Sequence, residues 1–142
     1  MTDSSTINAI FRLMRSLKCH LDRDLDALGL GLVPMQVRVL MTIHGQAQCT
    51  ANDIVNVIQR DKAQITRLIN GLIEQGLILK EPNPCDKRSQ LLVFTERGQY
   101  VQNLLLEHLE ASQKKMAAGL SQQELEQFES LAAKLASNLE AK

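Results

Sequence analysis

The hydrophobic pattern of this chain changes its period immediately after Gly76. Residues 61–75 carry apolar side chains at steps of three and four, which is typical of an amphipathic helix. The apolar runs that follow, 77–80 and 90–94, are short and flank a segment with two prolines, which excludes a helix there. The pattern therefore predicts a helix followed directly by a β-hairpin, with a long, basic-tipped loop at residues 81–88.

Helical patterns lie on both sides of this unit. A one-sided apolar stripe runs from Ile7 to Leu28, and Pro34 suits the first turn of a helix that we expect to end at His44. The predicted caps of the later helices are Thr50, Asp61, Thr95 and Ser121. The glycines that follow helical segments, and that we expect at left-handed positions after each helix, are Gly29, Gly45, Gly76 and Gly119.

Composition limits the classes of protein to which the chain can belong. With 142 residues, 44% hydrophobic and 23% charged, it has the balance of a folded globular protein. Its apolar stretches are too short to span a membrane, and its first residues lack the apolar core of a signal peptide, so we expect a cytoplasmic protein. The net charge is zero, but residues 59–98 hold seven basic and five acidic side chains. The positive excess therefore lies in the middle of the chain.

The helix at residues 61–75 has a polar face whose residue types suit base recognition. Rotation by 100° per residue places Ala63, Thr66, Arg67 and Asn70 opposite the apolar stripe, with Lys62 and Gln64 on the flanks. Arginine pairs with guanine, asparagine or glutamine with adenine, and a threonine methyl contacts thymine. The simpler interpretation is a solvated helix face. The preceding capped helix and the following hairpin favour a helix-turn-helix with a wing.

Three segments resemble the MarR family of winged-helix regulators. They are TRLINGLIEQGLI at 66–78, PNPCDKR at 82–88 and FTERG at 94–98. The most specific marks of the family are two spacings: an aspartate and an arginine separated by one residue, here Asp86 and Arg88, and a threonine and a glycine separated by two residues, here Thr95 and Gly98. Two positions depart from the family pattern: Cys85 stands where a polar residue is usual, and Phe94 where leucine is more frequent. The resemblance is strong over residues 32–98 and rests on helical pattern alone elsewhere.

The resemblance implies a fold that is mainly α with a small β-hairpin. A winged helix-turn-helix lobe at 32–98 would lie between helical dimerisation segments at 1–31 and 99–142. It implies that the helix at 61–75 enters the major groove and that Arg88 reaches the minor groove, which suits a guanidinium on a stiffened hairpin. Asp86 would hold an arginine or a backbone N–H inside the wing. Lys87, Thr50 and Asn52 are candidate phosphate contacts.

The same resemblance implies a homodimer, because similar proteins interleave their first and last helices with those of a second chain. An intramolecular bundle is the alternative. The apolar positions expected at the dimer interface are Ile7, Ile10, Phe11, Met14, Leu125, Phe128, Leu131 and Leu135. The implied function is regulation of transcription, as a repressor bound to a pseudo-palindromic duplex operator. Small aromatic or phenolic effectors would bind where the dimer region meets the DNA-binding lobe.

Other chemistry has weak support in the sequence. We expect no enzyme, cofactor or metal site, since no catalytic grouping stands out and His20, His44 and His108 show no two-ligand helical spacing. Cys85 would be exposed beside basic residues, so oxidation could disturb the wing, although an incidental thiol is the simpler interpretation. Two alternatives to the regulator remain: a winged-helix module that binds a protein partner, and a regulator that senses oxidants through Cys85.

Overall fold

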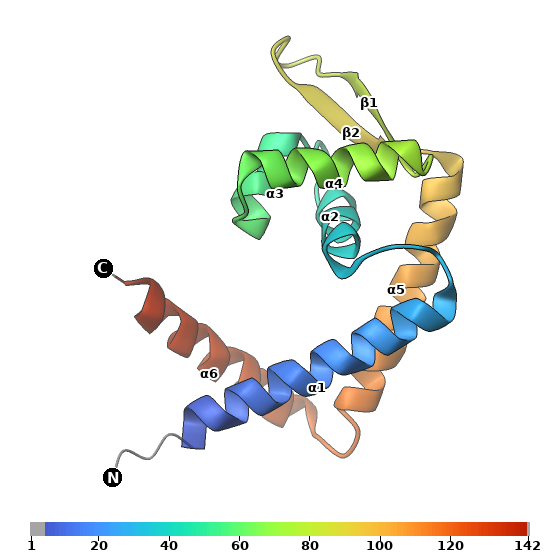
Figure 1. The fold of residues 1–142 in the computed structure, drawn as a ribbon. Coiled ribbons are helices and arrows are strands. Elements are labelled where there is room, and N and C mark those ends of the chain that lie inside the picture. The colour runs from blue at the N-terminus through green and yellow to red at the C-terminus, as the bar shows by residue number, and fades with distance from the viewer. Residues whose placement is uncertain (1–4, 142) are drawn as a thin grey trace. The chain divides into compact units, whose positions relative to one another are not determined.

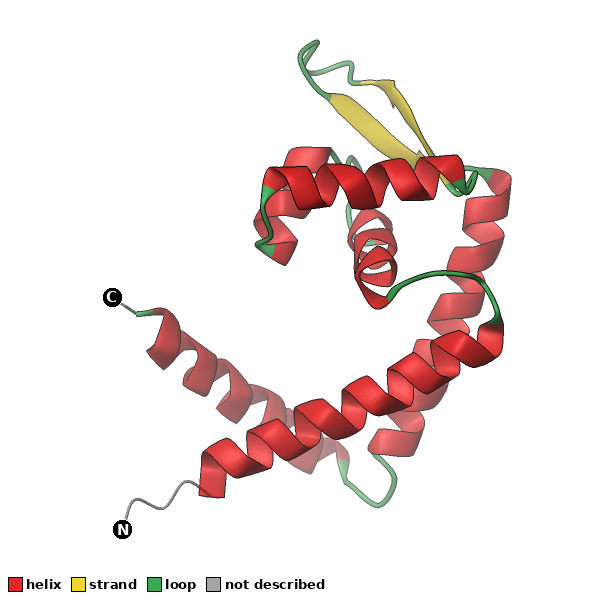
Figure 2. Ribbon diagram, in the orientation of Figure 1, coloured by secondary structure: helices red, strands yellow, loops and turns green. Residues whose placement is uncertain are grey.

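The computed structural model describes residues 5–141, which form six helices and one two-stranded antiparallel sheet (Figures 1 and 2). In chain order the elements are α1 (Ser5–Leu28), α2 (Pro34–His44), α3 (Ala51–Ile58), α4 (Lys62–Glu74), β1 (Ile78–Pro82), β2 (Gln90–Phe94), α5 (Glu96–Met116) and α6 (Gln122–Glu140). The predicted class, mainly α with a small hairpin, is confirmed. No helix between residues 5 and 141 has the length and apolar character that a membrane span requires.

The chain divides into two compact units after His108. The first contains α1 to α4, the hairpin and the first part of α5, and the second contains the rest of α5 together with α6. The predicted terminal segments, 1–31 and 99–142, include residues 1–4 and 142, which lie outside the described residues.

Side-chain caps explain why α3, α4 and α6 begin where the sequence predicts. Thr50 Oγ1 accepts the backbone N–H of Asp53 at 3.2 Å, while Asp53 Oδ2 accepts the backbone N–H of Thr50 at 2.9 Å. Asp61 Oδ1 accepts the N–H of Gln64 at 2.7 Å and so caps α4. Each bond satisfies a donor that would otherwise have no partner in the first turn. A capping box between Ser121 and Glu124 begins α6 in the same way.

The core of the first unit lies where α2, α3 and α4 meet. Leu40 of α2, Ile54 of α3, and Ile65 and Leu72 of α4 are all 0% exposed. The stripe predicted for residues 61–75 is therefore the face that α4 buries. Burial of this face fixes the rotation of α4 about its axis, and the opposite face is left to solvent.

The hairpin is longer than predicted on its first strand and is anchored to the start of α3. Strand β1 continues to Pro82, which pairs with Gln90 in the antiparallel register. The backbone N–H of Leu92 donates to the carbonyl of Cys49 at 2.8 Å, and Thr50 forms an isolated bridge with Leu91. The segment before α3 thus adds backbone hydrogen bonds to the edge of β2. This attachment joins the wing to the helix-turn-helix.

A tight joint connects the hairpin to α5. Thr95 Oγ1 donates to the carbonyl of Gly76 at 2.6 Å and accepts the N–H of Gly98 at 2.9 Å. The N–H of Thr95 donates to the carbonyl of Leu77 at 3.0 Å. A Cβ at position 98 would lie 1.8 Å from that same carbonyl oxygen, so only glycine fits. The spacing between Thr95 and Gly98 is therefore required by the close approach of two backbone segments at this joint.

One prediction about the helix ends is wrong. Gly29, Gly76 and Gly119 have the expected positive φ, but Gly45 has φ −77° and stays in the right-handed region. Its N–H still donates to the carbonyl of Met41 at 3.0 Å, so α2 ends without a left-handed residue. The sequence pattern did not indicate two left-handed residues: Gly31, with φ 68°, and Gln59, with φ 58°, which ends α3.

Candidate nucleic-acid interface

The solvent face of α4 carries the side chains that the sequence assigns to base recognition. Lys62, Ala63, Thr66, Arg67 and Asn70 are exposed, and Gln64 is half-buried. The hydroxyl of Thr66 donates to the backbone carbonyl of Lys62 at 2.8 Å, so it is committed within the helix. Figure 1 shows α4 beside the hairpin, which projects from the lobe that α2, α3 and α4 form. The structure thus places both predicted elements on one exposed part of the first unit.

The cations of this surface have no anionic partner among the described residues. Within residues 5–141, no ion pair involves Lys62, Arg67, Lys87 or Arg88. All four side chains are exposed. Exposed cations that lack an anionic partner favour a positive local potential on α4 and the wing, although the net charge of the chain is zero. Such a surface suits an anionic partner.

Short side-chain to backbone hydrogen bonds hold the tip of the wing. Asn83 Oδ1 accepts the N–H of Cys85 at 2.9 Å, and its amide donates to Ser89 Oγ at 2.9 Å. Asp86 Oδ1 accepts the N–H of Arg88 at 2.9 Å. The sequence suggests that Asp86 holds either an arginine or a backbone N–H. Within residues 5–141 its side chain accepts a backbone N–H and contacts no arginine side chain. These bonds fix the backbone from which the Arg88 side chain projects.

The start of α3 contributes less exposed surface than the sequence suggests. Thr50 is half-buried and both its N–H and its hydroxyl take part in the capping box with Asp53. Asn52, in the first turn of α3, is exposed. Asn52 is therefore the more accessible of the two candidate phosphate contacts at this helix.

The described cysteines differ in accessibility. Cys49 is 2% exposed, and burial, followed by the nearby charge of Asp53, raises the pKa of its thiol to about 11. A buried thiol with this pKa remains protonated and unreactive near neutral pH. Cys19 and Cys85 are exposed. Cys85 thus lies at the accessible wing tip, where its backbone N–H donates to the side chain of Asn83.

A contact between helices that the sequence did not indicate involves two histidines. His20 Nε2 lies 3.1 Å from Asp24 Oδ2, and His108 Nδ1 lies 3.6 Å from the same oxygen. One carboxylate of α1 therefore faces imidazoles from both α1 and α5. Among the described residues, no group of three or more His, Cys, Asp or Glu is arranged to hold a metal ion.

The apolar positions expected at a dimer interface are mostly in contact with solvent in the single chain. Phe11 and Met14 of α1 are 63% and 59% exposed, and Phe128 and Leu131 of α6 are 54% and 59% exposed. Ile7, Ile10 and Leu135 are also exposed, while Leu125 is half-buried. Neither helix has a fully buried residue. Two long helices therefore each present an apolar stripe to water.

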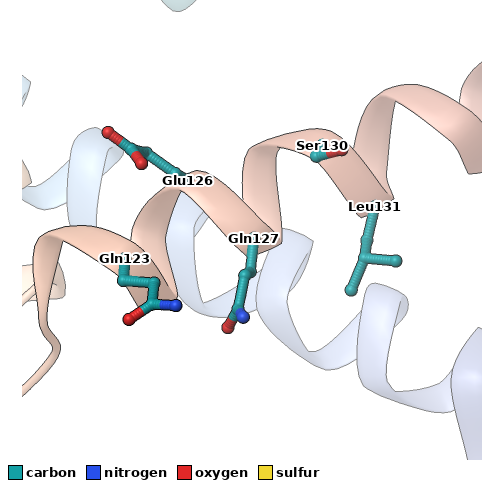
Figure 3. A pocket seen from close by; sticks show the side chains of 5 residues that line it. All are labelled: Gln123, Glu126, Gln127, Ser130 and Leu131. Carbon is teal, nitrogen blue, oxygen red and sulfur yellow. The ribbon is translucent and has the colours of Figure 1, made fainter.

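A shallow depression on α6 does not resemble a ligand site. It is lined by side chains of that one helix: Gln123, Glu126, Gln127, Ser130 and Leu131 (Figure 3). Ligand sites are usually concave, mostly apolar and built from several elements. Three of these residues are polar and uncharged, one is acidic, and Leu131 belongs to the exposed apolar stripe.

Comparison with known proteins shows which family and which relative this chain resembles. The model of a family described as the MarR family matches residues 30–89, from the loop before α2 to the wing tip. The HTH-type transcriptional regulator BilQ of Clostridioides difficile is 37% identical over 62 residues, which cover 44% of this chain and 42% of the relative. Residues 30–89 of the chain therefore resemble the MarR family. The stretch matched in this relative spans less than half of BilQ. The family model covers α2, α3, α4, β1 and the wing loop, and it ends just before β2.

Solved structures extend the likeness in fold to nearly the full length of the chain. A MarR protein from Peptoclostridium difficile has a TM-score of 0.80 at 24% identity, covering 98% of this chain and 90% of that one. A mutant MarR from E. coli, complexed with operator DNA, has a TM-score of 0.72 at 24% identity, with coverages of 95% and 99%. Bordetella bronchiseptica BpsR, whose DNA binding is regulated by 6-hydroxynicotinic acid, has a TM-score of 0.74 at 21% identity, with coverages of 100% and 99%. At these identities the likeness establishes a shared fold.

Proposed function

We propose that this protein is a cytoplasmic, homodimeric regulator of transcription that binds pseudo-palindromic duplex DNA as a repressor. The observation that carries the proposal is the set of exposed, unpaired cations on α4 and the wing. The α4 face would enter the major groove, with Arg67 and Asn70 in contact with base edges. Arg88 would enter the adjacent minor groove from a backbone held by Asp86 and Asn83.

Dimerisation is part of the proposal because of the apolar stripes on α1 and α6. Side chains such as Phe11 and Phe128 are more than half exposed in the single chain. Burial of contiguous apolar surface of this kind is the main driving force for association. A two-fold dimer would present two α4 helices to half-sites about one helical turn, roughly 34 Å, apart.

Control by a small molecule is supported by one buried polar atom. Gln102 of α5 is 0% exposed, its amide nitrogen lies 3.5 Å from Met41 Sδ, and its Oε1 has no hydrogen-bond partner among the described residues. A buried acceptor without a partner costs about 1–3 kcal/mol. We propose that, in a conformation in which the core opens beside Gln102, the O–H or N–H of a small aromatic effector donates to this oxygen. It would alter DNA affinity only if it binds the two conformations unequally.

Selection of bound duplexes from a random pool tests the proposed function. Enrichment of a pseudo-palindrome, bound by two chains, is the expected result. The Arg67→Gln, Arg88→Gln double variant should bind the selected duplex more weakly and with a shallower salt dependence. Arg12→Gln, a neutral replacement of an arginine on α1, is the matched control and should bind normally. If the double variant bound with unchanged affinity, the winged-helix module that binds a protein partner would be the better interpretation.

A further inference from the structure

Two exposed methyl groups lie next to each other near the start of α4. Ala63 and Thr66 are three residues apart, so they are neighbours on one helix face. Both are exposed, and the buried side chains of α4, such as Ile65 and Ile69, project to the opposite side. The part of α4 nearest its N-terminus, which enters the major groove in helix-turn-helix proteins, thus carries an apolar strip.

The hydroxyl of Thr66 is not available as a donor to a base. A threonine hydroxyl has one proton, and that proton is donated to the carbonyl of Lys62 at 2.8 Å. The methyl group of Thr66 has no such commitment. Thr66 therefore has its methyl group, and not a hydrogen-bond donor, to offer to a nucleic acid in front of α4.

The neighbouring side chains differ in this respect. Arg67 and Asn70 are exposed, and the ends of their side chains form no hydrogen bond or ion pair within residues 5–141. They keep all their donors for base edges. The α4 face thus combines a methyl-bearing part, Ala63 and Thr66, with a hydrogen-bonding part, Arg67 and Asn70.

We infer that Thr66, together with Ala63, reads the C5-methyl group of thymine in the major groove and so determines thymine over cytosine at the facing position. The C5-methyl is the only apolar group that a base pair presents in that groove, and small apolar side chains contact it. This inference rests on the proposed DNA binding, since it assigns a specificity to the same helix face. It predicts that discrimination depends on the methyl group of residue 66 and not on its hydroxyl.

Deoxyuridine substitution tests the inference because it removes only the thymine methyl. The probe is the duplex most enriched from the random pool, with each thymine replaced by deoxyuridine symmetrically in both half-sites. Burial of one methyl group corresponds to about fourfold in affinity per half-site, or about fifteenfold for both. We expect a loss of this size at one or two symmetric thymine positions and no loss at the others.

Variants at position 66 separate the methyl from the hydroxyl. Thr66→Val keeps a methyl group of the same shape and should keep the preference for thymine over deoxyuridine. Thr66→Ser keeps the hydroxyl but removes the methyl group, so it should lose most of the preference and keep only the part that Ala63 contributes. Thr42→Ser is the matched control, because Thr42 of α2 makes the same bond, to the carbonyl of Arg38 at 2.8 Å, away from α4. That control should retain the full preference, and circular dichroism spectra should show that all three variants are folded.

The possible failures are distinguishable. If no duplex is enriched, the proposed function and this inference both fall. If a duplex is bound but no thymine position shows an effect that depends on residue 66, or if Thr66→Val loses the preference while Thr66→Ser retains it, only the methyl readout is overturned.

Discussion

Replacement of Gly98 by alanine should break the joint between the wing and α5. The added Cβ would lie 1.8 Å from the carbonyl oxygen of Leu77 and 2.7 Å from its carbonyl carbon, whereas real contacts stay above 3.0 Å. The backbone would therefore have to separate by more than about 1 Å. That movement would also disturb the hydrogen bond from the N–H of Thr95 to the same carbonyl. Forced overpacking of a rigid site costs about 3 kcal/mol or slightly more.

The assay is unfolding in urea at a fixed protein concentration, because the proposed dimer would be stabilised by mass action. Gly45→Ala is the matched control: Gly45 has φ −77° and its nearest neighbour, the carbonyl oxygen of Met41, would lie 3.4 Å from the new Cβ. This control should change the free energy of unfolding by between zero and about 1 kcal/mol in the stabilising direction. A Gly98→Ala protein as stable as the Gly45→Ala protein would refute the close-crossing argument.

Three further predictions concern the dimer, the thiols and the effector site. Phe11→Glu places a charge in the apolar stripe of α1, so light scattering should find monomers at concentrations where the wild type is dimeric, and a dimeric variant would count against this interface. Cys19 and Cys85 should react with a disulfide reagent at pH 8 while Cys49 reacts only on unfolding. Folding raises the pKa of the Cys49 thiol from 9.0 to about 11, so the protonated thiol stabilises the folded state. This contribution to the free energy of unfolding should be lost as the pH rises from 9 to 11, and Cys49→Ala should show no such loss. Gln102→Leu removes the buried acceptor without a partner, so its melting temperature should equal or exceed that of the wild type, and a large decrease would contradict the assignment of Gln102.

The helix boundaries were predictable because their causes are local. Capping residues such as Thr50 and Ser121 bond within three residues of themselves, and the apolar period shows which face is buried. Gly45 shows a limit of local sequence patterns. A helix can end with a residue in either the left-handed or the right-handed conformation, and the sequence alone does not indicate which one occurs.

Contacts between distant segments were not predictable by this reasoning. The bond from Leu92 to the carbonyl of Cys49 and the meeting of His20 with His108 at Asp24 depend on tertiary placement. The exposed α4 face followed from the period alone, whereas the commitment of the Thr66 hydroxyl needed the side-chain conformation. The Asn83 to Ser89 bond joins residues across a loop, for which the sequence offers no periodic signal.

The salt dependence of duplex binding tests the central claim most directly. Affinity for the selected duplex, measured by fluorescence anisotropy from 50 to 200 mM salt, should fall steeply for the wild type, at about 0.9 in logarithmic slope per neutralised phosphate. Lys87→Gln, which removes one exposed wing-tip cation from each chain, should make the slope shallower by about 2 in a dimer. A slope that is already flat in the wild type, or that is the same in the variant, would contradict the assignment of this surface to DNA.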